Sequence, residues 1–164
     1  DKLIRPGMLV MDLGSAPGGW SQVAGGLVGE KGRVLATDIL PMAALDNVEF
    51  IQGDFTDDAV FRQLLDNLDG NQPDLIVSDI APNISGVAAS DQASSMYLVE
   101  LTLDMVRQVL KPGGNYVVKV FQGEGSDQFL KDVRSSFEKV VIRKPEASRP
   151  RSREVYFVAK GFKA

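Results

Sequence analysis

The sequence of 164 residues contains no cysteine and no histidine. Without these side chains the chain has no zinc-finger ligands, no thiolate nucleophile, no Ser-His-Asp triad and no imidazole base. Acid–base chemistry must therefore use Lys, Asp, Glu or Tyr. Only carboxylate or carbonyl oxygens remain as metal ligands, and we assign no metal site. No apolar run approaches the roughly 18 residues of a membrane span, and no signal-peptide pattern is visible, so we expect a cytoplasmic location.

The length and a composition of 44% hydrophobic and 24% charged residues are typical of one globular domain, which we expect to span residues 1–164. The net charge of −4 is distributed unevenly. Residues 1–130 carry 8 basic and 18 acidic side chains, whereas residues 131–164 carry 10 and 4. Five of the cations lie between Arg143 and Arg153. This segment is either a solvated loop with scattered charges or a surface that binds a polyanion.

Short apolar runs, typical of buried strands, alternate with helical patterns along the chain. We expect five such strands, at 8–14, 33–38, 48–54, 74–79 and 115–121. The predicted helices lie at about 18–28, from the cap Thr56 to Leu68, at about 91–110, and from about Phe129 to Phe137. Two final strands, at 140–143 and 155–159, have no helix between them and form an antiparallel hairpin. Together, these strands and helices predict an α/β, doubly wound, mostly parallel seven-stranded sheet with one antiparallel strand and helices on both faces.

In such sheets the ligand lies beyond the carboxyl ends of the strands, and the unusual residues of this sequence lie there. The first strand leads into a glycine-rich turn from Gly14 to Trp20, which either lets a ligand approach the backbone or is merely a tight turn. Trp20 by itself is equally compatible with core packing. Asp38 ends the second strand, where a carboxylate can accept both hydroxyls of an adenosine ribose. Asp54 ends the third and suits the amino group of adenine.

These residues fit either a nicotinamide dinucleotide or S-adenosylmethionine. A pyrophosphate needs free backbone donors at the start of the helix, but Ala16 replaces the second glycine of the usual motif and Pro17 removes a donor. Asp12 and Asp79 place negative charge around the ligand, which favours a cation such as a sulfonium with a free amino group. Asn83 stands where methyltransferases of base amines carry an aromatic ring, so a hydroxyl is the better methyl acceptor.

Lys119 interrupts the apolar run of the fifth predicted strand, where a lysine is rarely buried without a partner. Asp79 ends a neighbouring strand and Glu154 opens the last one, so the three side chains can converge beside the methyl donor. Burial and a nearby sulfonium favour a neutral amine, whereas carboxylates favour an ammonium. Lys119 therefore either takes the proton of a ribose hydroxyl or, still charged, orients that hydroxyl. The alternative without catalysis is a lysine that extends to the sheet end or pairs with one carboxylate.

At these residues the chain resembles the FtsJ/RrmJ family of ribosomal RNA ribose 2′-O-methyltransferases, over essentially all positions. The resemblance rests on four motifs, at 12–22, 78–83, 118–125 and 149–156. It implies a Rossmann-like S-adenosylmethionine-dependent methyltransferase fold, with cofactor contacts from Gly18, Trp20, Asp38, Asp54 and Asp79. It also implies a catalytic Lys-Asp-Lys-Glu tetrad, whose last three members match Asp79, Lys119 and Glu154, with Lys119 as the proton acceptor.

The implied reaction is transfer of a methyl group from S-adenosylmethionine to the ribose 2′-hydroxyl of a uridine in 23S large-subunit ribosomal RNA, within the ribosomal particle. We expect a monomer that contacts this RNA through the basic loop from Arg143 to Arg153. In the family the first tetrad lysine lies on a basic amino-terminal segment whose pattern Lys2 and Arg5 do not match, so we expect this chain to lack it. The alternatives are a non-catalytic RNA-binding or ribosome-assembly module that retains the cofactor pocket, and a nicotinamide-dependent oxidoreductase.

Overall fold

The structure is a computed structural model, and it describes residues 3–14, 19–80, 86–144 and 153–163. Along these residues the elements follow one another as β1 (Leu9–Leu13), α1 (Gly19–Val28), β2 (Arg33–Asp38), β3 (Val48–Gln52), α2 (Asp58–Leu68), β4 (Leu75–Ser78), α3 (Ala88–Val109), β5 (Asn115–Phe121), α4 (Ser126–Ser136), β6 (Phe137–Arg143) and β7 (Glu154–Phe162). The predicted alternation of strands and helices, followed by a hairpin, is therefore confirmed.

The seven strands form one sheet in the order β3-β2-β1-β4-β5-β7-β6. Neighbouring strands from β3 to β5 are parallel. β7 is antiparallel both to β5 and to β6, between which it lies. The strand order reverses between β1 and β4, because β2 and β3 add to one side of β1 and β4 to the other. The predicted mostly parallel sheet with one antiparallel strand is confirmed.

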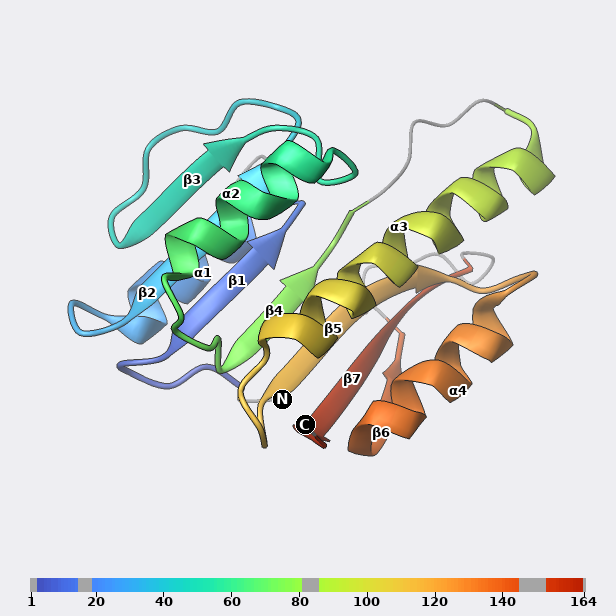
Figure 1. Cartoon of the computed structure of the whole chain (residues 1–164). Coiled ribbons are helices and arrows are strands. Elements are labelled where there is room, and N and C mark those ends of the chain that lie inside the picture. Colours follow the sequence, from blue (N-terminus) through green and yellow to red (C-terminus); the bar gives the residue numbers. More distant parts are fainter. Residues whose placement is uncertain (1–2, 15–18, 81–85, 145–152, 164) are drawn as a thin grey trace.

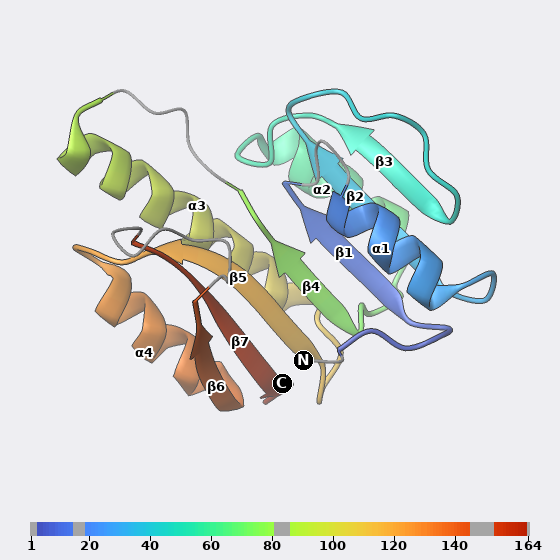
Figure 2. The ribbon, with the colours of Figure 1, turned by 180° about the vertical axis from the view of Figure 1, so that it is seen from behind.

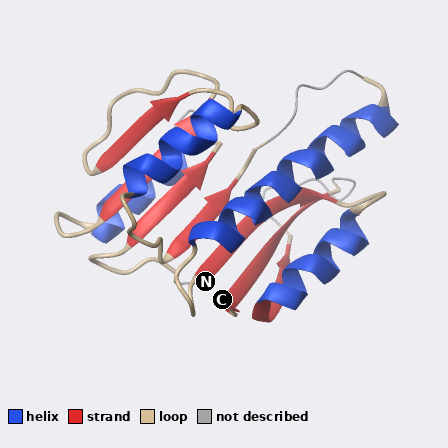
Figure 3. Ribbon diagram, in the orientation of Figure 1, coloured by secondary structure: helices blue, strands red, loops and turns tan. Residues whose placement is uncertain are grey.

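Helices cover both faces of this sheet. α2, α3 and α4 lie on the face turned towards the viewer in Figure 1, and α1 lies on the opposite face, in front in Figure 2. Figure 3 shows the same layers, with the strands in red and the helices in blue. Each face has its own core. Leu64, Val99 and Phe129 from the three helices of one face belong to one buried cluster, and Ala24 and Val28 from α1 belong to the other.

The start of α2 shows how the sequence sets the end of a helix. Asp57 is the cap, since its carboxylate accepts a hydrogen bond from the Ala59 N–H at 2.9 Å. The prediction that Thr56 caps this helix was wrong by one residue, because the Thr56 hydroxyl donates to a preceding carboxylate instead. Leu64 and Leu68, which lie one turn apart on α2, are buried, and burial of each stabilises the fold by about 2 kcal/mol.

Phe137 was predicted to end the last helix, but it opens β6. It is buried, with its ring centroid 6.0 Å from that of Tyr116 and 5.4 Å from that of Phe162. Phe137 fits the helical spacing of the apolar residues of α4, but this fit is a coincidence. β6 follows α4 directly, and its first residue is the one that packs into the core. β6 and β7 are consequently longer than predicted, whereas β3 ends at Gln52, two residues early.

α3 has 22 residues and begins three residues before the predicted start at 91. Glu100, Asp104 and Arg107 on this helix are exposed, while Val99 and Val106 are buried against the sheet. Among the residues that the structure describes, no helix has the length and the apolar character needed to cross a membrane.

Candidate active site

The carboxyl ends of the five parallel strands β1 to β5 lie at one edge of the sheet. β7 runs the other way and therefore begins at this edge, with Glu154 opposite Phe121. Backbone hydrogen bonds tie the loops of this edge together: the Gly14 N–H donates to Thr37 at 2.9 Å, and the Asp79 N–H donates to Leu13 at 3.1 Å. Because the strand order reverses here, this is where the fold places a ligand.

Lys119 and Asp79 form an ion pair at this edge. Lys119 Nζ lies 3.0 Å from Asp79 Oδ1, and the two side chains are 13% and 27% exposed. The ammonium also lies 5.6 Å from the ring centroid of Phe121. These partners explain how a lysine is accommodated in an otherwise apolar strand. They also hold its nitrogen near the carboxyl end of β5.

Tyr156, which the sequence analysis did not single out, joins this pair. It stands opposite Lys119 in the pairing of β5 with β7, and its hydroxyl donates to Asp79 Oδ1 at 3.4 Å. Burial, together with the negative charges of Asp79 and Glu154, raises the pKa of Tyr156 to about 12, so the phenol is protonated at neutral pH. Glu154 lies two residues earlier on β7, hence on the same face of the sheet. The structure thus brings Asp79, Lys119 and Glu154 to one face of one edge.

Asp12 is buried between β1 and α1. It is 2% exposed, and its Oδ2 accepts a hydrogen bond of 2.6 Å from the Ser21 hydroxyl of α1. Its Oδ1 has no hydrogen-bond partner, and it is the one buried side-chain oxygen or nitrogen in the described parts of the chain without one. Burial raises the pKa of Asp12 to about 6, with the charges of Asp79 and Asp38 adding to the rise and the Ser21 hydrogen bond opposing it. An unused buried acceptor beside the glycine turn fits a cationic ligand that donates hydrogen bonds.

The other predicted cofactor residues follow the neighbouring strands. Asp38 ends β2 and accepts a hydrogen bond from the Leu40 N–H at 3.0 Å. Asp54, two residues after β3, accepts from the N–H and the hydroxyl of Thr56 at 2.9 and 2.7 Å, which fixes the orientation of its carboxylate. Trp20 is 44% exposed on α1, so it is not a core side chain. The sheet edge therefore gathers carboxylates from β1, β2 and β4, and from the loop after β3.

Several predicted positions lie outside the described residues. They are Lys2, Ala16, Pro17, Gly18, Asn83 and the middle of the basic loop at 145–152. Arg143 and Arg153, which flank that stretch, are described, and both side chains are exposed.

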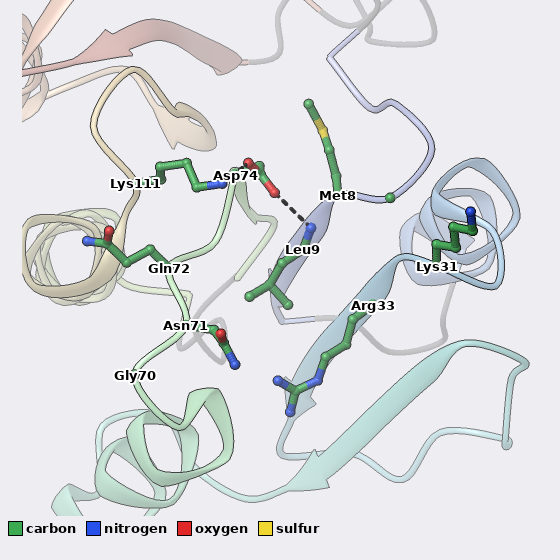
Figure 4. Close-up of a pocket in the computed structure, with 10 residues that line it drawn as sticks. Met8, Leu9, Lys31, Arg33, Gly70, Asn71, Gln72, Asp74 and Lys111 are labelled. Carbon is green, nitrogen blue, oxygen red and sulfur yellow. Dashed lines mark hydrogen bonds and ion pairs between the residues drawn. The ribbon is translucent and has the colours of Figure 1, made fainter.

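A concavity of about 420 Å³ lies at the opposite edge of the sheet, where β1 and β2 begin (Figure 4). The cations Lys31, Arg33 and Lys111 line it. Two of them are paired: Lys111 Nζ lies 2.9 Å from Asp74 Oδ1, and Arg33 Nε lies 2.7 Å from Glu49 Oε1. Because these charges are largely neutralised and the cavity is remote from the strand ends, the candidate active site is the carboxyl edge.

Comparison with known proteins identifies relatives of this chain. The model of the family described as FtsJ-like methyltransferase matches residues 1–162. The ribosomal RNA large subunit methyltransferase E of Stutzerimonas stutzeri is 91% identical over 163 residues, which cover 99% of this chain and 79% of that protein. The protein of the same name from Pseudomonas aeruginosa is 55% identical over 163 residues, with the same coverage of both.

Solved structures show the same architecture. A protein of Plasmodium falciparum, assigned as a ribosomal RNA methyltransferase, has a TM-score of 0.84 and 28% identity, over 96% of this chain and 88% of that chain. The fibrillarin of Aeropyrum pernix, with natively bound S-adenosyl-L-methionine, has a TM-score of 0.67 and 16% identity, over 97% of this chain and 69% of that chain. The second likeness is one of fold alone.

Proposed function

Because the chain belongs to the FtsJ-like methyltransferase family, we propose that Asp79, Lys119 and Glu154 form the group that carries out its methyl transfer. The chain is an S-adenosylmethionine-dependent 2′-O-methyltransferase of 23S ribosomal RNA with a Rossmann-like fold. This assignment takes precedence over a nicotinamide-dependent oxidoreductase and over a non-catalytic assembly module. We further propose that the acceptor is a uridine and that the substrate is the ribosomal particle.

S-adenosylmethionine supplies a methyl carbon whose bond to sulfur breaks as the ribose oxygen bonds to it, and the hydroxyl proton is released. The carboxylate of Asp38 is suited to the ribose hydroxyls of this cofactor, and that of Asp54 to its adenine amino group. The unpartnered Oδ1 of Asp12 supports a positively charged ligand at this edge. As cofactor contacts we propose Gly18, Trp20, Asp38, Asp54 and Asp79.

The observation that carries the proposal is the ion pair of 3.0 Å between Lys119 Nζ and Asp79 Oδ1. As an ammonium, Lys119 can only donate hydrogen bonds, so it orients the ribose oxygen while the proton leaves to water. As a neutral amine it accepts that proton itself. Asp79 positions the nitrogen for either role, and Glu154 adds negative charge on the same face. Both roles place Lys119 against the reacting hydroxyl.

RNA binding is proposed for the basic segment from Arg143 to Arg153. The support is the excess of cations in residues 131–164 and the exposure of both flanking arginines beside the edge that holds Glu154. Several cations on one segment can displace several counterions from RNA phosphates. A monomeric state and a location in the cytoplasm stay predictions of the sequence.

The test is methylation of large ribosomal subunits that lack the modification, with labelled S-adenosylmethionine. Lys119→Ala is expected to lower kcat by about 10²- to 10⁴-fold, the usual range for loss of an acid–base group, while the Kd of the cofactor changes less than about twofold. Lys119→Arg separates the two roles, since arginine orients a hydroxyl but does not accept its proton. Lys160→Ala, which removes a lysine opposite Asn115 at the far end of the same strand pair, is the matched control. Full activity of Lys119→Ala would contradict the proposal.

A further inference from the structure

We infer that Asp12 is the counter-charge for the cationic cofactor, and that binding of the cofactor drives a proton off this buried carboxyl. The inference rests on the proposed function, since it requires S-adenosylmethionine as the ligand. It concerns a residue that belongs neither to the proposed catalytic group nor to the proposed cofactor contacts.

The geometry leaves half of this carboxyl group without a partner. Ser21 donates to Oδ2 at 2.6 Å, and Oδ1 accepts no hydrogen bond although the residue is only 2% exposed. Buried polar atoms in folded proteins are almost always paired with protein or with water. Asp12 Oδ1 is the one buried side-chain oxygen or nitrogen in the described ranges that lacks a partner. It therefore indicates a place where a ligand completes the hydrogen bonding.

The position of Asp12 in the sheet gives the same indication. Asp12 is the fourth of the five residues of β1, two residues before Gly14. It pairs with Ala36 of β2 on one side and with Val77 of β4 on the other, so it lies in the strand next to which the strand order reverses. Asp12 therefore lies directly behind the turn over which ligands of this fold bind.

The chain itself offers this carboxyl no positive partner in its described parts. α1, which packs over Asp12, contains no ionisable residue from Gly19 to Val28. The ends of β2 and β4 contribute two more acids, Asp38 and Asp79. The cation of β5, Lys119, forms its ion pair with Asp79 instead. The negative charges of two other acids thus act on Asp12, and Lys119 pairs with one of those acids.

A cationic ligand changes this balance. In the cofactor-free protein, burial and the two neighbouring acids hold the pKa of Asp12 at about 6, against the opposing hydrogen bond from Ser21. Near pH 6 about half of the molecules then carry a protonated Asp12. S-adenosylmethionine brings a sulfonium and an ammonium, which favour the ionised carboxylate, so binding releases the proton to the buffer.

The experiment is calorimetric titration of S-adenosylmethionine into the protein, in buffers of different ionisation enthalpy. At about pH 6 we expect release of about half a proton per bound cofactor, and at about pH 7, below the pKa of the cofactor's α-amino group, only about a tenth. The affinity is expected to rise about tenfold from about pH 5 to about pH 7. Asp12→Asn keeps the acceptor for Ser21 but does not titrate, so it should bind more weakly and release no proton. Asp104→Asn, exposed on α3, should behave like the wild type.

Ser21→Ala gives a second measurement if the asparagine variant does not fold. Loss of this hydrogen bond raises the pKa of Asp12 further, so the pH of greatest proton release should move upwards. Cofactor binding without proton release at about pH 6, or the same release in Asp12→Asn, would overturn the inference and leave the proposed function standing. Failure of the wild type to bind S-adenosylmethionine at all would overturn both.

Discussion

The buried carboxyl of Asp12 makes the stability of the cofactor-free protein depend on pH, and Asp12→Asn should remove that dependence. The pKa of Asp12 is raised from 3.8 to about 6, mainly by burial. Between these values the folded protein binds more protons than the unfolded chain. Protonation of Asp12 therefore contributes fully to the free energy of unfolding below about pH 4, and this contribution is lost as the pH rises through about 6. The difference between the two pKa values corresponds to about 3 kcal/mol of unfolding free energy, of which about half is lost above pH 5.

Urea unfolding of the cofactor-free protein, followed by far-UV circular dichroism between about pH 5 and pH 8, measures this loss. The wild type is expected to lose about 1.5 kcal/mol more than Asp12→Asn across this range. Asp104→Asn, whose carboxyl is exposed on α3, should follow the wild-type curve. Parallel curves for the wild type and Asp12→Asn would refute the reasoning, because they would show that this carboxyl does not titrate differently in the folded and unfolded states.

Two further changes test the basic segment and the turn after β1. Arg143→Gln combined with Arg153→Gln should flatten the salt dependence of RNA binding by about one to two in log–log slope, whereas Arg62→Gln on α2 should leave it unchanged. An unaltered slope in the double variant would contradict the proposed RNA contact. Gly14→Ala should lower the urea midpoint more than Gly70→Ala. Both glycines have a positive φ, 81° and 78°, but only at Gly14 would an added Cβ lie 2.6 Å from another residue, at Cγ1 of Ile80. Equal losses in the two alanine variants would show that this close approach does not matter.

The strands were the most predictable part of the fold. β2 and β5 begin and end at the predicted residues, because central strands of the sheet are mostly apolar and stop where polar or glycine residues begin. The helix ends were less predictable. Thr56 and Asp57 are both good caps, and the choice between them depends on a hydrogen bond from Thr56 to Asp54 that the sequence pattern does not contain.

The candidate site was predictable as a set of strand ends but not in its contacts. The rule that ligands bind beyond the carboxyl ends placed Asp38, Asp54 and Asp79 at one edge. The role of Tyr156 depends on the pairing of β5 with β7, which α4 and β6 separate along the chain. The negative charge of Asp12 was expected, whereas its burial and its unpartnered oxygen depend on how α1 packs. The burial of a side chain and the register of two paired strands depend on tertiary packing, so short sequence motifs do not predict them.

The place of β7 in the sheet has a consequence for synthesis of the protein. The last strand of the chain fills the space between β5 and β6 and brings Glu154 to the edge that already holds Lys119. A nascent chain that ends before residue 154 has two open strand edges where the finished protein has paired backbone, and it lacks one of the three proposed catalytic side chains. Closing the sheet and bringing Glu154 to the proposed catalytic group are therefore one event, which requires that residues 154–162 have left the ribosome.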